Sequence, residues 1–324
     1  MSATATRSLL CIPLAKARYR AVDHAPDDEC WKVLHRLADA AYLALLDDML
    51  AVLEAVRPAI PREALTQRVL SGDQADTEQL LTQVWDEVGQ QGLEGTLVPR
   101  LRTLALDAAE ATPLPEAGST FDAQDLVLLL ALDAFLSTQV ATISATTRTA
   151  IPALVQRALA PTLPLPGTSA PLPPALSLPQ RIDELTQVVG LTPRQAASVQ
   201  RFRQGLEQGG ETPARIQALV ERRATAMRRQ RAETISRTES ITSVHVGQQQ
   251  RFEQAAREGT LDTVRFRRFW IVTPDDRLCP NCSSIPGLNL AGRALGEPFA
   301  TPYGPLLHPA AHALCRCSVA GRSV

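Results

Sequence analysis

The residues of this 324-residue chain that are best suited to chemistry are four cysteines and a histidine near the C-terminus. The cysteines form two pairs, Cys279-x-x-Cys282 and Cys315-x-Cys317, and His312 lies just before the second pair. A C-x-x-C knuckle presents two thiolates to one tetrahedral ion, and a distant Cys/His pair completes the shell. The spacing predicts a structural zinc site on Cys279, Cys282, His312 and either Cys315 or Cys317.

Two other states of these cysteines fit the same spacing. Disulfides form in an oxidising compartment, and reduced thiols can be packed in a core or act as redox groups. We favour the metal, because the segment around the cysteines is rich in glycine and proline and needs a cross-link to fold. Cys11 and Cys30 stand apart near the N-terminus, where we expect ordinary buried cysteines.

The same segment gives little support for catalysis. His308 and His312 have the i, i+4 spacing of a metal-binding helix, but Pro309 lies between them and no glutamate follows the first histidine. The H-E-x-x-H pattern of metalloproteases is therefore absent. Asp275 and Asp276 lie close to the knuckle and are typical of a turn, although they could also bind a cation. We expect no enzymatic activity, and a metal-dependent nuclease or peptidase is the alternative.

The residues before the knuckle predict helices that lead into a strand. Thr192-Pro193 and Thr212-Pro213 each combine an N-cap with a proline at the first helical position. They predict a helix over residues 194–208 and a long helix from residue 213 through Met227, and Gly259 ends the last helix before the strand. The β-branched and aromatic residues of 264–272 predict a strand, and Thr273 begins a turn after it.

The first half of the chain predicts helices and no catalytic site. Apolar residues at spacings of three and four between residues 31 and 53 predict an amphipathic helix that ends near Pro58. Shorter helices are predicted over 61–69, 77–88 and 99–111. Residues 122–148 and 151–160 are apolar on several faces, which indicates packing against helices or against another chain. We expect a helical docking or scaffold domain at residues 1–160.

A proline-rich stretch divides the sequence. Residues 161–180 contain seven prolines, and proline fixes φ and removes a hydrogen-bond donor, so we expect an extended, semi-rigid linker. The second domain then covers residues 181–324, with helices at 181–259 and a small α+β tail, stapled by cysteine and histidine, at 260–324. The fold class that we predict is mainly α.

Composition and charge limit the partners. The hydrophobic content of 45% and charged content of 21% are typical of a soluble globular protein. The longest apolar run, residues 126–132, is much shorter than a membrane span, and we expect no membrane partner. Residues 201–268 carry 14 arginines against 8 acidic residues, which indicates a basic surface for DNA or an acidic partner. The arginines expected at this surface are Arg222, Arg223, Arg228, Arg229 and Arg231.

The motifs occur in a particular order along the second half of the chain. The series is residues 190–196, Ile235-x-Arg237-Thr238-Glu239, Gly247-Gln248, Trp270-x-x-Thr273-x-Asp275-x-Arg277, Cys279-x-x-Cys282, Gly287, Phe299 and His312-x-x-Cys315-Arg316-Cys317. In this order it resembles the C-terminal domain of phage minor head proteins of the Mu F type, also called phage head morphogenesis proteins. The resemblance covers about residues 185–319. Ala313 follows His312 where the family has proline, and His308-Pro309 is the His-Pro pair of this chain.

The resemblance implies a virion protein that is assembled in the host cytoplasm. Members of the family are present in few copies, associate with the portal vertex inside the head, and assist head assembly and DNA packaging or delivery. The implied partners are the portal protein, the major capsid protein and packaged DNA through non-specific contacts. Structural roles are expected for Arg237, Glu239, Trp270, Asp275 and Arg277, with Arg237 and Glu239 in a buried polar network that ties helix to strand. A free-standing DNA-binding regulator is a further alternative, but no helix-turn-helix with a basic recognition helix stands out.

Overall fold

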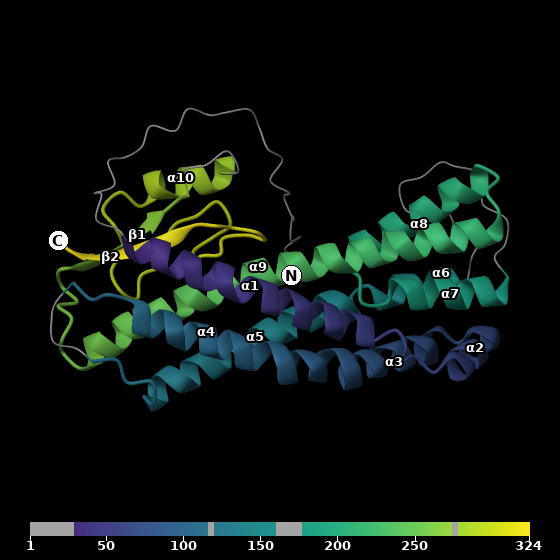
Figure 1. The fold of residues 1–324 in the computed structure, drawn as a ribbon, viewed down its shortest axis with the longest axis horizontal. Coiled ribbons are helices and arrows are strands. Elements are labelled where there is room, and N and C mark those ends of the chain that lie inside the picture. Colours follow the sequence, from purple (N-terminus) through teal and green to yellow (C-terminus); the bar gives the residue numbers. More distant parts are fainter. Residues whose placement is uncertain (1–28, 116–119, 160–176, 274–277) are drawn as a thin grey trace, which may run out of the picture. The chain divides into compact units, whose positions relative to one another are not determined.

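The computed structural model describes residues 29–115, 120–159, 177–273 and 278–324 (Figure 1). Its elements are mainly helices, with one two-stranded sheet near the C-terminus, which confirms the predicted fold class. The described residues form two compact units, one from those within 29–41, 102–132 and 237–324 and the other from those within 42–101 and 133–236. Each unit takes segments from both sides of the proline-rich stretch. Residues 161–176 of that stretch lie outside the described residues, so the linker stays a prediction there, whereas residues 178–180 already belong to a helix and the predicted end of the linker is wrong.

The second unit is helical. Its elements are α2 (Arg62–Ser71), α3 (Gln74–Val84), α6 (Ile151–Leu159), α7 (Leu178–Val188) and α8 (Pro193–Gln208), with parts of α1 (Glu29–Ala55), α4 (Val98–Ala111), α5 (Leu126–Arg148) and α9 (Pro213–Arg257). Here α3 packs on α6, and α6 packs on α7. The predicted start of α8 is confirmed, because Thr192 Oγ1 accepts a hydrogen bond from the Gln195 backbone N–H and Gln195 Oε1 accepts one from the Thr192 backbone N–H.

Residues 74–111 form one continuous helical run, although the sequence predicts two separate helices at 77–88 and 99–111. Between α3 and α4 the chain continues through two π-helical stretches, Trp85–Gln90 and Leu93–Leu97. The fully buried Trp85 ring fills the space beside Gly89, where a Cβ atom would lie 2.5 Å from the ring. Packing of Trp85 therefore overrides the poor helix propensity of the glycines.

The first unit contains the sheet. Strand β1 (Phe266–Ile271) pairs antiparallel with β2 (Ser318–Ser323), with Phe266 opposite Ser323 and Ile271 opposite Ser318. Helix α10 (Pro280–Leu288) lies beside this pair (Figure 1). The sequence predicts β1 but neither β2 nor α10, because β2 is small and polar and α10 contains Pro286.

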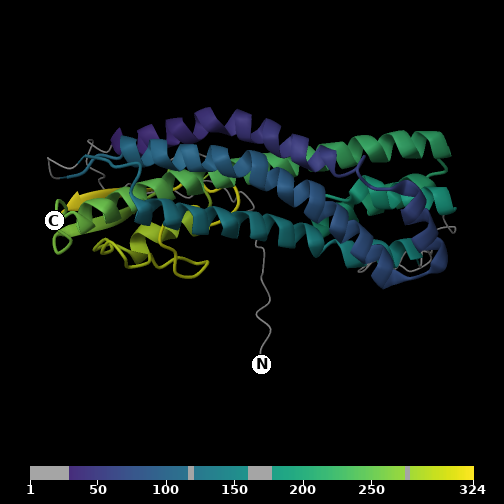
Figure 2. The same ribbon diagram turned by 90° about the horizontal axis from the view of Figure 1, so that it is seen from below.

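Helix α9 is buried on two faces in the first unit, and its C-terminal part runs beside β2 (Figure 2). On one face Gly247 lies against α4, since a Cβ atom there would be 1.9 Å from the carbonyl oxygen of Ala105. On the other face Phe252 packs against Phe266 of β1, with ring centroids 4.8 Å apart. The helix therefore connects the rest of the unit to the sheet.

One stretch of the described chain, Leu126–Leu159, is long and apolar enough to cross a membrane by length and composition alone. A core helix of a soluble protein passes the same test, so a single stretch is weak evidence. The expectation of no membrane partner stays a prediction.

Candidate metal centre

The first pair of cysteines starts helix α10. Cys279 is the N-cap, and its Sγ accepts a hydrogen bond from the backbone N–H of Cys282 at 3.3 Å. Pro280 occupies the first helical position, where its missing N–H costs nothing. Both thiols are buried and are turned by the helix start towards one point, as the C-x-x-C spacing predicts.

A tight turn brings the second set of donors to the same point. The backbone N–H of Cys315 donates to the carbonyl oxygen of His312 at 3.0 Å. His312 Nε2 lies 3.4 Å from Cys279 Sγ and 3.0 Å from Cys282 Sγ, and Cys282 Sγ lies 3.9 Å from Cys315 Sγ. A tetrahedral zinc ion with ordinary bond lengths has S···S edges of about 3.8 Å and S···N edges of about 3.6 Å. The observed S···S separation is close to its edge, and the two S···N separations are shorter than theirs.

The donors form two groups that share Cys282. One is Cys279, Cys282 and His312; the other is Cys282, Cys315 and Cys317; the ligand atoms of each group lie within 4.8 Å of one another. All four cysteines are free thiols and form no disulfide. These Cys/His groups can therefore hold a metal ion, as the spacing predicts.

The ring of His312 is oriented for coordination. Its Nδ1 lies 2.7 Å from the carbonyl oxygen of Ala313, so this nitrogen carries the proton and donates it. Nε2 is then the nitrogen with a free lone pair, and it faces the sulfur atoms. His308 belongs to neither group, and its Nδ1 lies 2.8 Å from the carbonyl oxygen of Pro309.

Hydrogen bonds among the cysteines give their thiols different pKa values. Hydrogen bonds from Cys282 and Cys317 lower the pKa of Cys315 to about 2, whereas hydrogen bonding to Cys315 raises the pKa of Cys282. Of Cys282, Cys315 and Cys317, only Cys315 has a lowered pKa, so its thiolate is the favoured one of these three. A bound cation would displace the protons from its other thiol ligands.

Helix α9 fixes the loop that carries the second set of donors, His312 and Cys315. The backbone N–H of Leu314 donates to Thr238 Oγ1 at 3.1 Å, and Leu314 has a left-handed φ of 63°. Across the loop, Thr273 Oγ1 donates to the carbonyl oxygen of Arg316 at 2.6 Å. The middle residue of the Arg237-Thr238-Glu239 motif thus positions the turn between His312 and Cys315.

Two further residues of α9 hold the start of β2. His245 Nε2 lies 3.2 Å from the carbonyl oxygen of Cys317, and Gln248 Nε2 donates to the carbonyl oxygen of Val319 at 3.0 Å. Burial lowers the pKa of His245 to about 3, so its ring is neutral. His245 is seven residues after Thr238, and Gln248 is three residues after His245, so helical spacing could have placed these residues on one face; our sequence analysis missed His245.

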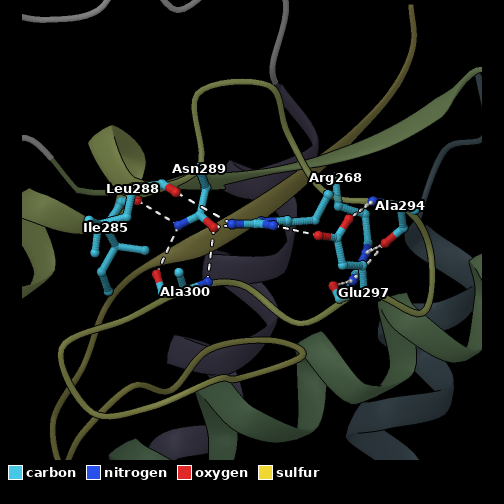
Figure 3. A network of polar contacts seen from close by, with 8 residues as sticks. Arg268, Ile285, Leu288, Asn289, Ala294, Glu297 and Ala300 are labelled. Carbon is cyan, nitrogen blue, oxygen red and sulfur yellow. Dashed lines mark hydrogen bonds and ion pairs between the residues drawn. The ribbon is translucent and has the colours of Figure 1, made fainter.

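The tail is held together at two places, which we call ties. The first is the cluster of Cys and His donors, and the second is a set of hydrogen bonds, centred on Arg268 of β1, that holds the loop after α10 (Figure 3). The guanidinium is 1% exposed and donates to Gln249 Oε1 and to the carbonyl oxygens of Ala294, Glu297 and Leu307. Burial lowers its pKa to about 10, which leaves it charged. The sequence gives little sign of this role, because Arg267 and Arg268 look alike there.

Asn289 extends this tie at the end of α10. Its side-chain amide donates to the carbonyl oxygens of Ile285 and Ala300, and its Oδ1 accepts the backbone N–H of Ala300 at 2.9 Å. Arg293 also donates to Asn289 Oδ1. Residues 285–300 are therefore held through polar contacts of the chain itself.

The other residues of the predicted motifs have different surroundings. Trp270 lies in the apolar cluster with the four cysteines and contacts Phe299 edge to face, with ring centroids 5.2 Å apart. Arg237 is exposed, while Glu239 is buried and its Oε2 has no hydrogen-bond partner among the described residues. Burial raises the pKa of Glu239 to about 7. Polar contacts do tie α9 to the loop before β2 and to β2 itself, but they are formed by Thr238, His245 and Gln248. Asp275 and Arg277 lie outside the described residues.

Two of the arginines expected at a basic surface are buried, so that part of the prediction is wrong. Arg228 donates to the carbonyl oxygen of Gln187, and Arg231 to Thr147 Oγ1. They satisfy polar groups inside the second unit, a role that the charge pattern cannot reveal. The other three, Arg222, Arg223 and Arg229, are exposed, and Arg229 pairs with Glu233.

Comparisons with protein-family models, with curated proteins and with solved structures found no match.

Proposed function

We propose that this chain is a minor capsid protein of a tailed phage, associated with the portal vertex, whose C-terminal module is stapled by a structural zinc ion. The observation that carries the proposal is that residues of the motif series meet in one place. Thr238 and Gln248 of α9, Trp270 of β1, and the Cys/His donors all belong to one module around the candidate metal centre. They position backbone and metal donors, which is what a structural module requires.

The donor set favours a structural ion over a catalytic one. Five Cys and His donors converge where a tetrahedral ion needs four, and neither group contains a carboxylate among the described residues. Catalytic zinc sites keep an open position for water or substrate. An ion that is fully surrounded by protein donors cannot activate water, which argues against the nuclease or peptidase alternative.

Virion association is tested by co-assembly. The full chain would be produced together with the portal and major capsid proteins of the phage that carries it, and the assembled particles purified by sedimentation. We expect the protein in particles that contain portal and its loss from particles assembled without portal. Equal amounts in both kinds of particle would contradict portal association.

The enzyme alternative is tested on the zinc-loaded chain with duplex DNA, single-stranded DNA and unstructured peptide as substrates. We expect no turnover above that of the metal-free protein. Turnover that disappears in His312→Ala would overturn the structural assignment.

The remaining basic surface is proposed to contact packaged DNA. Arg222 and Arg223 have no carboxylate partner among the described residues, and Arg223 donates to Ser198 and lies 6.0 Å from the centroid of the Phe202 ring. R222Q/R223Q should weaken binding to duplex DNA and reduce the slope of log K against log salt by about 2, since each phosphate contact contributes about 0.9. A matched control is R215Q/R229Q, in which both arginines already pair with glutamates. Equal slopes for the two double variants would contradict the contact.

A further inference from the structure

The candidate metal centre has one more donor than a tetrahedral ion uses. Cys279, Cys282 and His312 make the first group, and the second group adds Cys315 and Cys317 to the shared Cys282. Zinc takes four ligands in structural sites. One of the five donors must therefore be left out, and the backbone around Cys315 differs from that around Cys317.

Cys315 belongs to a turn that resembles the first knuckle. In Cys279-x-x-Cys282 the two donors are three residues apart across a helix start, and in His312-x-x-Cys315 they are three residues apart across a turn closed by the Cys315 N–H. Two such turns, facing each other, supply two donors each. Cys282 Sγ lies 3.9 Å from Cys315 Sγ, close to the edge of about 3.8 Å in a ZnS tetrahedron.

The loop that carries Cys315 is also held in place by a contact with helix α9. Thr238 Oγ1 accepts the N–H of Leu314, the residue immediately before Cys315. The left-handed φ of 63° at Leu314 is unusual for a leucine and reverses the chain between His312 and Cys315. Removing this bend would separate the two donors.

Cys317 belongs instead to the sheet. It immediately precedes β2, and its carbonyl oxygen is fixed by His245. Alternation along an extended chain places Cys317 on the same face as Val319, which is opposite Trp270 in the β1–β2 register. Cys315 and Cys317 are both 2% exposed and both lie in the apolar cluster with Trp270, so the strand register, and not burial, assigns Cys317 to the core as a small apolar residue.

We propose that Cys315 is the fourth ligand of the ion, and that Cys317 is a non-coordinating thiol of the apolar core. The ion then has three thiolates and one imidazole. This inference rests on the metal-stapled module proposed above, and it assigns different roles to two cysteines that the sequence does not distinguish.

The test compares Cys317→Ala with Cys315→Ala in the full chain, with Co²⁺ as the probe. Cobalt occupies tetrahedral zinc sites, and the intensity of its sulfur-to-metal charge-transfer absorption rises with the number of thiolate ligands. C317A should bind one Co²⁺ per chain with the spectrum of the unaltered protein. C315A should lose about one third of the charge-transfer intensity, because one of three thiolates is gone, and should bind the ion more weakly.

Several results would overturn the inference. A reduced charge-transfer intensity in C317A does so by itself, even where C315A fails to fold. Equal losses in the two variants, with His312→Ala unchanged, would show a four-cysteine site. If the unaltered chain binds neither Co²⁺ nor Zn²⁺, the metal part of the proposed function fails first, and that result is distinct from a wrong ligand assignment.

Discussion

The tail after β1 is held at two places that use opposite kinds of chemistry. Around Arg268, a buried charge is surrounded by oxygen acceptors that the chain itself provides, including Gln249 Oε1 and the carbonyl oxygens of Ala294 and Glu297. Around Cys282, buried donors that suit a metal ion face one another, with His312 Nε2 only 3.0 Å away. The first arrangement is complete within the chain itself, and the second consists of donors that a cation would join.

This difference teaches how a tail of low hydrophobic content is stabilised. A buried arginine is tolerated when each donor finds an acceptor, and it then orders a loop without any added group. A cluster of thiols and imidazole gains most of its stabilising energy from an ion. We therefore expect the Arg268 side of the tail to be insensitive to chelators and the cysteine side to depend on metal.

The largest effect is expected from Cys282→Ala, because Cys282 is common to both donor groups. Loss of this thiolate should abolish stoichiometric zinc binding, and the apparent free energy of structural zinc binding is on the order of 10 kcal/mol. Metal content after dialysis measures the loss, with Ser283→Ala on the same helical turn as the control. Full zinc content in C282A would contradict the shared role.

Arg268→Lys should destabilise the module while leaving its zinc content unchanged. A lysine ammonium cannot reach the acceptors that the guanidinium spans, and each buried acceptor left unsatisfied costs about 1–3 kcal/mol. We expect a loss of about 3 kcal/mol or more in the free energy of unfolding, measured by urea denaturation in excess zinc. Arg267→Lys, on the neighbouring residue of the same strand, is the matched control. If zinc content falls with stability, the two ties are not separate.

A pH dependence should come from Glu239 on α9, between the two ties. Its folded-state pKa is raised to about 7 from an ordinary 4.5, so the folded protein keeps a proton that the unfolded chain releases between these values. The contribution of Glu239 to stability is full below pH 4.5 and is lost as the pH rises to 7. Glu239→Gln has no such titration, so its stability relative to the unaltered chain should rise by about 3 kcal/mol from pH 4.5 to 7.

Urea denaturation of both proteins at several pH values in excess zinc measures this difference. Subtracting one curve from the other removes the common pH dependence of metal binding. A difference that stays constant with pH would show that Glu239 keeps its ordinary pKa in the folded chain.

The smallest losses of stability are expected from substitutions in α9, at one residue that contacts each tie. Thr238→Val removes the acceptor of the Leu314 N–H, and Gln249→Met removes an acceptor of Arg268. Each should cost about 1 kcal/mol. T238V alone should also weaken zinc binding by about 10-fold or more, because contacts behind the ligands orient them. Competition with a chromogenic chelator measures the affinity, and equal affinities in the two variants would contradict the division of roles.

The sequence predicts those parts of this module that depend on local chemistry. Thr192 and Pro193 predict the start of α8, and the spacing of Cys279 and Cys282 predicts a convergence of thiols that the structure contains. Both signals are local, because an N-cap or a knuckle needs only three or four residues. The buried phenylalanine and tryptophan of β1 likewise predict a strand without knowledge of its partner.

Other features depend on partners that are distant in sequence. Strand β2 has little strand propensity and exists because it pairs with β1. Helix α9 contains Arg222, Arg228, Arg229 and Arg231. Arg228 and Arg231 are buried, and only the packing around the helix distinguishes them from the other two. Arg268 and His245 have roles that arise from loops more than 25 and 70 residues away, respectively, as their contacts with Ala294 and Cys317 show.

The central claim is that a metal ion completes the cysteine side of the C-terminal module, and hydrogen exchange of the full chain before and after chelation tests it most directly. The protein would be purified under reducing conditions and its zinc content measured first. We predict about one zinc per chain, and on chelation a loss of amide protection in residues 278–285 and 310–317 with protection retained in 289–307. A chain without metal, or one whose exchange is the same with and without chelator, would contradict the account.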